Sequence, residues 1–242
     1  MQHSSHHYIL KISCPATSGI VAAVTTFLAQ SGCYISEMAQ FDDEFHERFF
    51  MRAVFRGNSG GELDLAQIEK GFAGVAERFA MQWELHSQAQ PMRVLLMVSK
   101  YDHCLNDLLY RYHKGEMHMQ ITAIVSNHLD LRPMAEREGI RFIYLPVNKD
   151  NKAQQEAELL KIVQDTQTEL VVLARYMQIL SDDLCRHLNG RAINIHHSFL
   201  PGFKGAKPYH QAWDRGVKLI GATAHYVTSD LDEGPIIEQE VQ

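Results

Sequence analysis

The feature that most constrains the fold of this chain is a change of rhythm after Pro91. Beyond that residue, short apolar segments alternate with amphipathic segments of helical period, and several apolar segments are continuous runs. Continuous runs are typical of strands buried on both faces, and the alternation is typical of a parallel sheet covered by helices. We therefore expect an open, mostly parallel α/β sheet, with strands at 93–98, 121–126, 142–145, 170–173, 192–196 and 221–226.

The segment before Pro91 has a different order. Strands are expected at 8–13, 33–41, 49–56 and 81–85, with one helix after the first strand and another after the third. The second helix has apolar residues spaced 3, 4, 3 and 4 apart from Leu65 to Phe79, which gives it one apolar face. This β-α-β-β-α-β order predicts a ferredoxin-like domain at 1–86. Residues 87–91 are polar, aperiodic and end in proline, so they are interpreted as a linker to a second domain at 92–242.

Charge and composition limit the possible partners. The net charge of -6 predicts no general attraction to nucleic acid or to an anionic membrane. No apolar stretch approaches the roughly 20 residues that a membrane span requires, and the four cysteines form no C-x-x-C pair. We expect a cytoplasmic protein with reduced thiols and no metal site. The cluster of His3, His6 and His7 is interpreted as a tag-like end rather than a metal site.

Polar residues with catalytic potential follow two of the expected strands. Asn194 and His196 are two residues apart in a strand, so their side chains are expected to face one cavity. Asp232 lies in a polar turn after the next strand, where its carboxylate is expected to reach the imidazole. An amide, a histidine and a carboxylate suit attack by water or an amine on a small carbonyl. From spacing alone, an equal alternative is that Asn194 and His196 only satisfy backbone groups at a strand end.

Four ordered motifs resemble the folate-dependent formyltransferase family. They are L-A-R-Y-M-Q-I-L-S from Leu173, N-I-H-H-S-F-L-P from Asn194, G-A-T-A-H-Y-V from Gly221 and D-L-D-E-G-P-I-I from Asp230. The resemblance implies a Rossmann-like catalytic domain in which Asn194, His196 and Asp232 are catalytic. It also implies a set of substrate-binding residues, namely Arg175, Tyr176, Met177, Gln178, Ile179, His197, His225 and Asp230. Of these, His197 is expected to face away from His196 if the strand continues, and to support specificity rather than chemistry.

The loop after the first strand of the second domain separates the reactions of that family. Glycinamide ribonucleotide formyltransferases carry a glycine-rich loop there, whose backbone N–H groups can cradle a phosphate. The loop from Ser99 to Leu105 contains no glycine. Together with the following residues it resembles the S-K-x-x-H-C-L-x-D-L-L stretch of formyltetrahydrofolate deformylases, which also place an ACT-type module first. This resemblance implies hydrolysis of 10-formyltetrahydrofolate to formate and tetrahydrofolate, which supplies formate for purine synthesis and balances the one-carbon folate pool.

The resemblance also suggests a mechanism without a cofactor, because folate is the substrate. Water would add to the formyl carbon while Asn194 and protonated His196 donate hydrogen bonds to the oxyanion. Asp232 would orient the water, keep His196 charged and relay protons. Two other functions stay open: formyl transfer to an amine acceptor, and a catalytically silent sensor of folate or amino acids.

The ACT-type resemblance has two further implications, of unequal weight. Such modules typically pair side by side, which implies a homo-oligomer, and bind amino acids such as glycine or methionine at the junction. Here Ala16 replaces the aspartate of the common C-P-D-x-x-G turn, so an effector is expected less than dimerisation, and a purely structural role is an equal alternative. Members of the resembled family continue with further sheet and helix, so the resemblance also implies truncation after Gln242.

Overall fold

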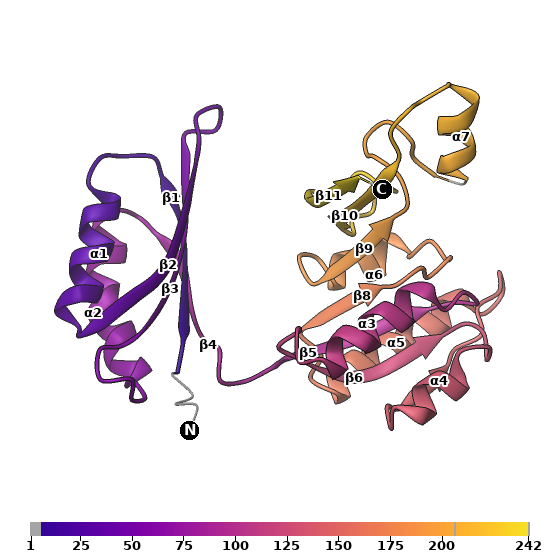
Figure 1. Cartoon of the computed structure of the whole chain (residues 1–242), viewed down its shortest axis with the longest axis horizontal. Coiled ribbons are helices and arrows are strands. Elements are labelled where there is room, and N and C mark those ends of the chain that lie inside the picture. Colours follow the sequence, from indigo (N-terminus) through magenta and orange to yellow (C-terminus); the bar gives the residue numbers. More distant parts are fainter. Residues whose placement is uncertain (1–5, 206, 242) are drawn as a thin grey trace. The chain divides into compact units, whose positions relative to one another are not determined.

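A computed structural model gives the structure of residues 6–205 and 207–241, so His3 of the predicted tag-like end lies outside the described residues. The chain divides into two compact units, Met1–Gln90 and Pro91–Gln242 (Figure 1). The last strand of the first unit ends at Ser87 and the first strand of the second begins at Met92. In the part of the chain that the structure describes, no helix is long and apolar enough to cross a membrane.

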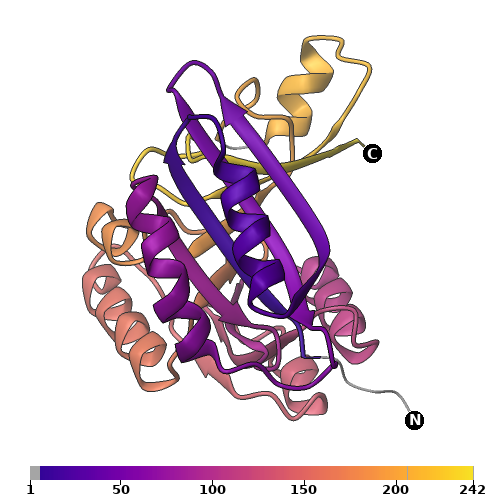
Figure 2. The same cartoon turned by 90° about the vertical axis from the view of Figure 1, so that its left-hand side faces the viewer.

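The first unit is a four-stranded antiparallel sheet in the order β2-β3-β1-β4. Its elements are β1 (Tyr8–Pro15), α1 (Ile20–Gln30), β2 (Cys33–Asp43), β3 (Arg48–Gly57), α2 (Leu65–Arg78) and β4 (Gln82–Ser87). Both helices lie against one face of the sheet (Figure 2). Alternate residues of β1, from Tyr8 through Leu10 and Ile12 to Cys14, are buried under them. The predicted β-α-β-β-α-β order is therefore confirmed.

Several strands of this unit extend beyond their expected ends. Strand β2, expected to end at residue 41, includes Asp42 and Asp43, which pair with Phe49 and Arg48. Strand β4 extends into the expected linker. The Asp43 carboxylate accepts hydrogen bonds from the backbone and ring of His46, so it closes the turn from the strand end. Strand β2 therefore extends to Asp43, whose carboxylate stabilises the turn that follows.

The second unit contains a seven-stranded sheet in the order β11-β10-β9-β8-β5-β6-β7. The strands from β9 to β7 are parallel, β10 runs antiparallel to β9, and β11 antiparallel to β10. The strands are β5 (Met92–Val98), β6 (Met119–Ser126), β7 (Phe142–Tyr144), β8 (Leu170–Leu173), β9 (Ala192–His196), β10 (Gly221–Tyr226) and β11 (Ile236–Val241). The helices are α3 (His103–His113), α4 (Arg132–Arg137), α5 (Lys152–Asp165), α6 (Asp182–His187) and α7 (Pro208–Asp214). The mostly parallel sheet predicted from the apolar runs is confirmed.

Helices cover both faces of this sheet. On one face Leu105 of α3 and Ala135 of α4 pack with Leu96 of β5, and on the other Leu159 of α5 and Leu184 of α6 pack near the alternate strand residues. The central strand β5 pairs with β6 on one side and with β8 on the other, so the strand order reverses at β5. Ligands of open α/β sheets bind beyond the carboxyl ends of the strands at such a switch point. The fold therefore directs attention to the segments that follow β5, β8 and β9.

Candidate active site

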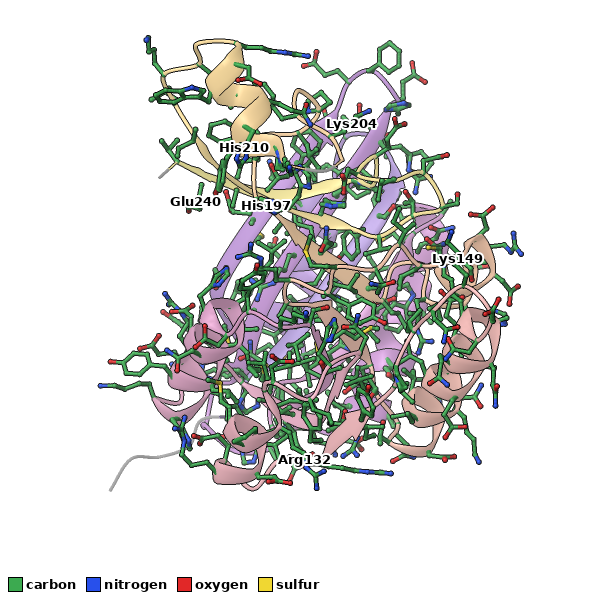
Figure 3. All side chains as sticks on the ribbon, turned by 90° about the vertical axis from the view of Figure 1, so that its right-hand side faces the viewer. Arg132, Lys149, His197, Lys204, His210 and Glu240 are labelled. Atoms are coloured by element: carbon green, nitrogen blue, oxygen red, sulfur yellow. The ribbon has the colours of Figure 1, made fainter. Side chains whose placement is uncertain are left out.

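A cavity of about 300 Å³ lies at the carboxyl ends of β8 and β9 and beside β10. All three predicted catalytic residues line it. Its lining consists of Leu173, Arg175, Tyr176, Met177, Gln178, Ile179, Leu180, Cys185, Asn194, Ile195, His196, His197, Gly205, His225, Val227, Thr228, Ser229, Leu231 and Asp232. Figure 3 labels His197 in the part of the unit that carries β9 and β10. The structure thus brings together four chain segments that are far apart in sequence.

The amide of Asn194 is oriented by His225. The two residues are register partners on the antiparallel pair of β9 and β10, so their side chains project together. Because the carbonyl of Tyr226 can only accept, Nδ1 of His225 carries the proton of their 2.9 Å hydrogen bond. In the neutral ring, Nε2 then accepts from Nδ2 of Asn194 at 3.2 Å. One amide N–H of Asn194 remains for a substrate oxygen.

His196 is almost fully buried, with 4% of its surface exposed. Its Nε2 donates to the carbonyl of Phe203 at 2.7 Å, and its Nδ1 faces Oδ2 of Asp232 at 3.4 Å. Both neighbours are acceptors, which suits a ring protonated on both nitrogens. In this geometry neither N–H is left for an oxyanion, so the alternative that His196 satisfies a backbone group is partly correct.

The carboxylate of Asp232 lies between two imidazoles. It is 3.4 Å from Nδ1 of His196 and 3.8 Å from Nε2 of His225, and it accepts a hydrogen bond from the backbone N–H of Gly205 at 2.9 Å. The backbone at Asp232 has a φ of 57°, in the left-handed region. Such a conformation costs roughly 1–3 kcal/mol and often marks functional sites. Nearby, a Cβ on Gly234 would lie 1.7 Å from the carbonyl oxygen of Tyr226, so this turn requires glycine.

The segment after β8 is anchored by a buried polar network that the sequence analysis missed. The Ser99 hydroxyl accepts from the backbone N–H of Met177 at 3.1 Å and donates to Oδ1 of Asn127 at 2.6 Å. Ser99 and Asn127 are both buried. At the far end of the segment, the Glu156 carboxylate accepts from the backbone N–H of Ser181 at 3.0 Å. The place of Ser99 directly after the first strand of the sheet was the available signal.

This anchored segment forms the apolar wall of the cavity. Met177 and Ile179 line it and are 56% and 60% exposed, whereas Leu180 is 8% exposed and belongs to the core. Burial and the nearby Glu156 carboxylate raise the pKa of Tyr176 to about 12, so its phenol stays protonated. Exposed apolar side chains around a cavity are typical of a wall for a flat ligand.

Two predicted binding residues lie differently from expectation. Strand β9 ends at His196, so the alternation stops there and His197 lines the same cavity, with its ring 5.6 Å from that of His196. Burial, then the charges of His196 and Arg175, lower the pKa of His197. Asp230 is exposed and does not line the cavity; its carbonyl accepts from the hydroxyl of Thr228 at 3.0 Å. Leu231 occupies the lining from this turn instead.

Among the residues that the structure describes, no group of three histidine, cysteine or acidic side chains is arranged to hold a metal ion. The cavity lining contains one carboxylate, that of Asp232.

Comparisons with known proteins agree on one family. Residues 92–242 match the formyl transferase family. A formyltetrahydrofolate deformylase of Corynebacterium sp. is 52% identical across 97% of this chain and 82% of its own length, and that of Bacillus subtilis is 45% identical across 96% and 78%. The crystal structure of the Burkholderia mallei formyltetrahydrofolate deformylase has a TM-score of 0.89 at 54% identity, covering 98% of this chain and 83% of that one.

A more distant likeness covers a smaller share of the chain. Glycinamide ribonucleotide transformylase 1 of Symbiobacterium toebii is 28% identical, with a TM-score of 0.60, over 66% of this chain and 76% of that one. The deformylases instead match nearly the whole chain, including the first unit. The chain belongs to the formyltetrahydrofolate deformylase family, within the wider formyl transferases.

Proposed function

We propose that this protein hydrolyses 10-formyltetrahydrofolate to formate and tetrahydrofolate. The observation that carries the proposal is the pair of Asn194 and Asp232 in one cavity, the first with a free amide N–H and the second with a buried carboxylate. Relatives named as deformylases, 44–52% identical to this chain, support the same reaction. The released formate would feed purine synthesis, and the tetrahydrofolate would return to the one-carbon pool.

The reaction needs an activated water, a stabilised oxyanion and a protonated leaving nitrogen. Asp232 accepts a proton from the water as its oxygen bonds to the formyl carbon. Asn194 donates its free N–H to the formyl oxygen as negative charge develops there. The carbon–nitrogen bond then breaks, the proton moves from Asp232 to the leaving nitrogen, and formate departs with the oxygen of the water.

The geometry sharpens the role of His196. Its Nδ1 lies beside the Asp232 carboxylate and its Nε2 is held by the carbonyl of Phe203. A ring that carries a proton on both nitrogens donates toward the Asp232 carboxylate and keeps it fixed. We therefore assign His196 as the cationic partner of Asp232, and Asn194 as the principal oxyanion donor.

The folate is proposed to bind along the segment after β8. Met177 and Ile179 would contact the flat ring, while backbone groups from Arg175 to Gln178 would bind its polar edges. His197 is proposed to lie beside the formyl group, because it lines the cavity next to His196. The turn near Asp230 would contribute through Thr228, Ser229 and Leu231, which line the cavity.

The test is incubation of the protein with 10-formyltetrahydrofolate alone, with formate measured over time. Formate release without an acceptor supports hydrolysis. Loss of the formyl group only when an amine is added, with the formylated amine as product instead of formate, would establish transfer, and binding without turnover would establish a sensor.

We also propose that the first unit is an ACT-type module that pairs with a second copy in a cytoplasmic homo-oligomer. Edge strand β2 exposes Tyr34, Met38 and Phe41, which are 53%, 42% and 63% exposed. Long apolar edge strands favour pairing with another chain. Light scattering measures the oligomer, and calorimetry with glycine or methionine tests for an effector.

A further inference from the structure

Arg175 is a cation without a counterion in the wall of the cavity. It directly follows the buried Ala174 after β8, and its backbone has a φ of 60°. A residue other than glycine costs free energy in that conformation, and such outliers often have a functional reason. No ion pair to Arg175 occurs among residues 6–205 and 207–241, and its Nε is buried without a hydrogen-bond partner. The guanidinium therefore has unused binding capacity.

The groups that hold Arg175 do not neutralise it. Its Nη1 donates to Nε2 of His103 at 2.8 Å, and its guanidinium carbon lies 4.4 Å from the centre of the Tyr101 ring. An arginine can only donate, so this nitrogen of His103 is an acceptor and carries no proton. Tyr101 lies in the glycine-free loop after β5 and His103 is the first residue of α3, so this segment aims the arginine instead of cradling a phosphate.

The other charges around the cavity leave the positive charge of Arg175 uncompensated. The one carboxylate in the lining, that of Asp232, already lies beside His196 and His225. His197 lies within the electrostatic reach of both Arg175 and Asp232. An anion that enters the cavity would therefore meet a free guanidinium close to the catalytic residues.

We propose that Arg175, positioned by Tyr101 and His103, is a binding site for a small carboxylate, and that its ligand is the formate product. This inference rests on the proposed hydrolysis. A carboxylate offers two oxygens to the planar fork of a guanidinium, whereas the formyl amide offers one. The Nη2 of Arg175 makes no hydrogen bond among the described residues and is free to bind a carboxylate oxygen. The site thus distinguishes the product from the substrate and draws formate away from the folate nitrogen that has just left its carbon.

The test measures inhibition of hydrolysis by sodium formate at constant ionic strength, with sodium chloride as the balancing salt. Arg175→Met should raise the formate inhibition constant at least tenfold, because it removes a charge-assisted pair. His103→Leu, which keeps the arginine but removes its support, should raise it by a smaller factor. Arg132→Met is the matched control, since Arg132 is exposed on α4 and pairs with Glu136; its inhibition constant should not change. Equal constants in all four proteins would overturn the proposal.

A second set of measurements distinguishes formate from the glutamyl tail of the substrate as the ligand of Arg175. It also tests formate binding independently of hydrolysis. Line broadening of ¹³C-formate by the wild-type protein reports binding even if no hydrolysis occurs. Loss of broadening in Arg175→Met supports the site, and unchanged broadening refutes it. A substrate without its glutamyl tail distinguishes the alternative source: if Arg175→Met raises KM only for the tailed substrate, and formate inhibition is unaltered, the arginine binds the tail. Absence of turnover with normal formate binding would refute the proposed function alone.

Discussion

The two units of this protein differ in whether they bury polar side chains. Every polar or charged residue that is buried among the described residues lies in the second unit, including Ser99, Asn127, His196, His225 and Asp232. The first unit buries an apolar layer under its helices and leaves polar side chains at the surface. Burying a polar group is costly unless it is hydrogen-bonded. The second unit holds these groups with hydrogen bonds and ion pairs, several of them around the cavity, whereas the first unit is built on an apolar layer.

Among the changes that test this difference between the units, Asp232→Asn in the second unit should have the largest effect on the catalytic rate. The change removes the proton acceptor and leaves an amide facing His196, so we expect kcat to fall by about 10²–10⁴. Formate release at saturating substrate measures it. Asp107→Asn, an exposed exchange of the same type on α3, is the control. Near-normal hydrolysis by the Asp232 variant would remove the carboxylate from the mechanism.

Asn194→Ala should have the second-largest effect on the catalytic rate. Losing an oxyanion donor lowers the rate by roughly 10²–10³ in a well-studied hydrolase. Loss of the Asn194 amide leaves the buried Nε2 of His225 without a donor, so the variant should lose about 1–3 kcal/mol of stability while staying folded in the assay. Steady-state kinetics and thermal unfolding are measured together, with the exposed Asn106→Ala as the matched exchange. A rate within threefold of wild type would show that another group stabilises the oxyanion.

Asn127→Ala tests whether the buried network positions the folate segment. It leaves the Ser99 hydroxyl without its acceptor, which costs about 1–3 kcal/mol of stability. The hydroxyl is then free to turn, so its bond to Met177 weakens and KM should rise more than kcat falls. Thermal unfolding and Michaelis curves check both parts. An unchanged KM in a destabilised protein would make the network purely structural.

His197 in the second unit should make the stability of the folded protein depend on pH. Its pKa is lowered in the folded protein from an ordinary value of 6.5, so the unfolded chain binds more protons as the pH falls through that value. The folded state is then penalised below about pH 6.5. His197→Gln should lose less stability than wild type between neutral and mildly acidic pH in denaturant titrations. Parallel pH profiles of the two proteins would contradict the burial of a neutral ring.

The smallest effect on catalysis is expected in the first unit. Phe41→Asp places a charge on the exposed edge of β2, where 63% of the phenylalanine surface is accessible. It should weaken self-association and leave kcat of the dissociated protein near that of wild type. Light scattering and kinetics over a dilution series test this. A fall in kcat that persists at every concentration would mean that the first unit contributes to turnover directly.

Local pattern predicted much of the fold because each strand has its own periodicity. The continuous runs of β5 and β8 reflect burial on both faces, and the spacing of the α2 residues reflects one buried face. Both are properties of a single segment. The end of β9 at His196, which turns His197 into the cavity, depends on how the chain leaves the sheet.

The site was predictable as a set of residues but not as a geometry. The pairing of Asn194 with His225 follows from the register of β9 and β10, which no local spacing reveals. The bond between His196 and the Phe203 carbonyl likewise depends on the path of an irregular segment. These long-range contacts are the basis for proposing His196 as the partner of Asp232 instead of an oxyanion donor.

The most direct test of the central claim is hydrolysis in H₂¹⁸O with 10-formyltetrahydrofolate as the only substrate. If Asp232 activates water for attack on the formyl carbon, the formate released contains one ¹⁸O atom and forms without any added amine. A formylated amine in place of formate when an acceptor is added, or formate that lacks the label, would contradict the account.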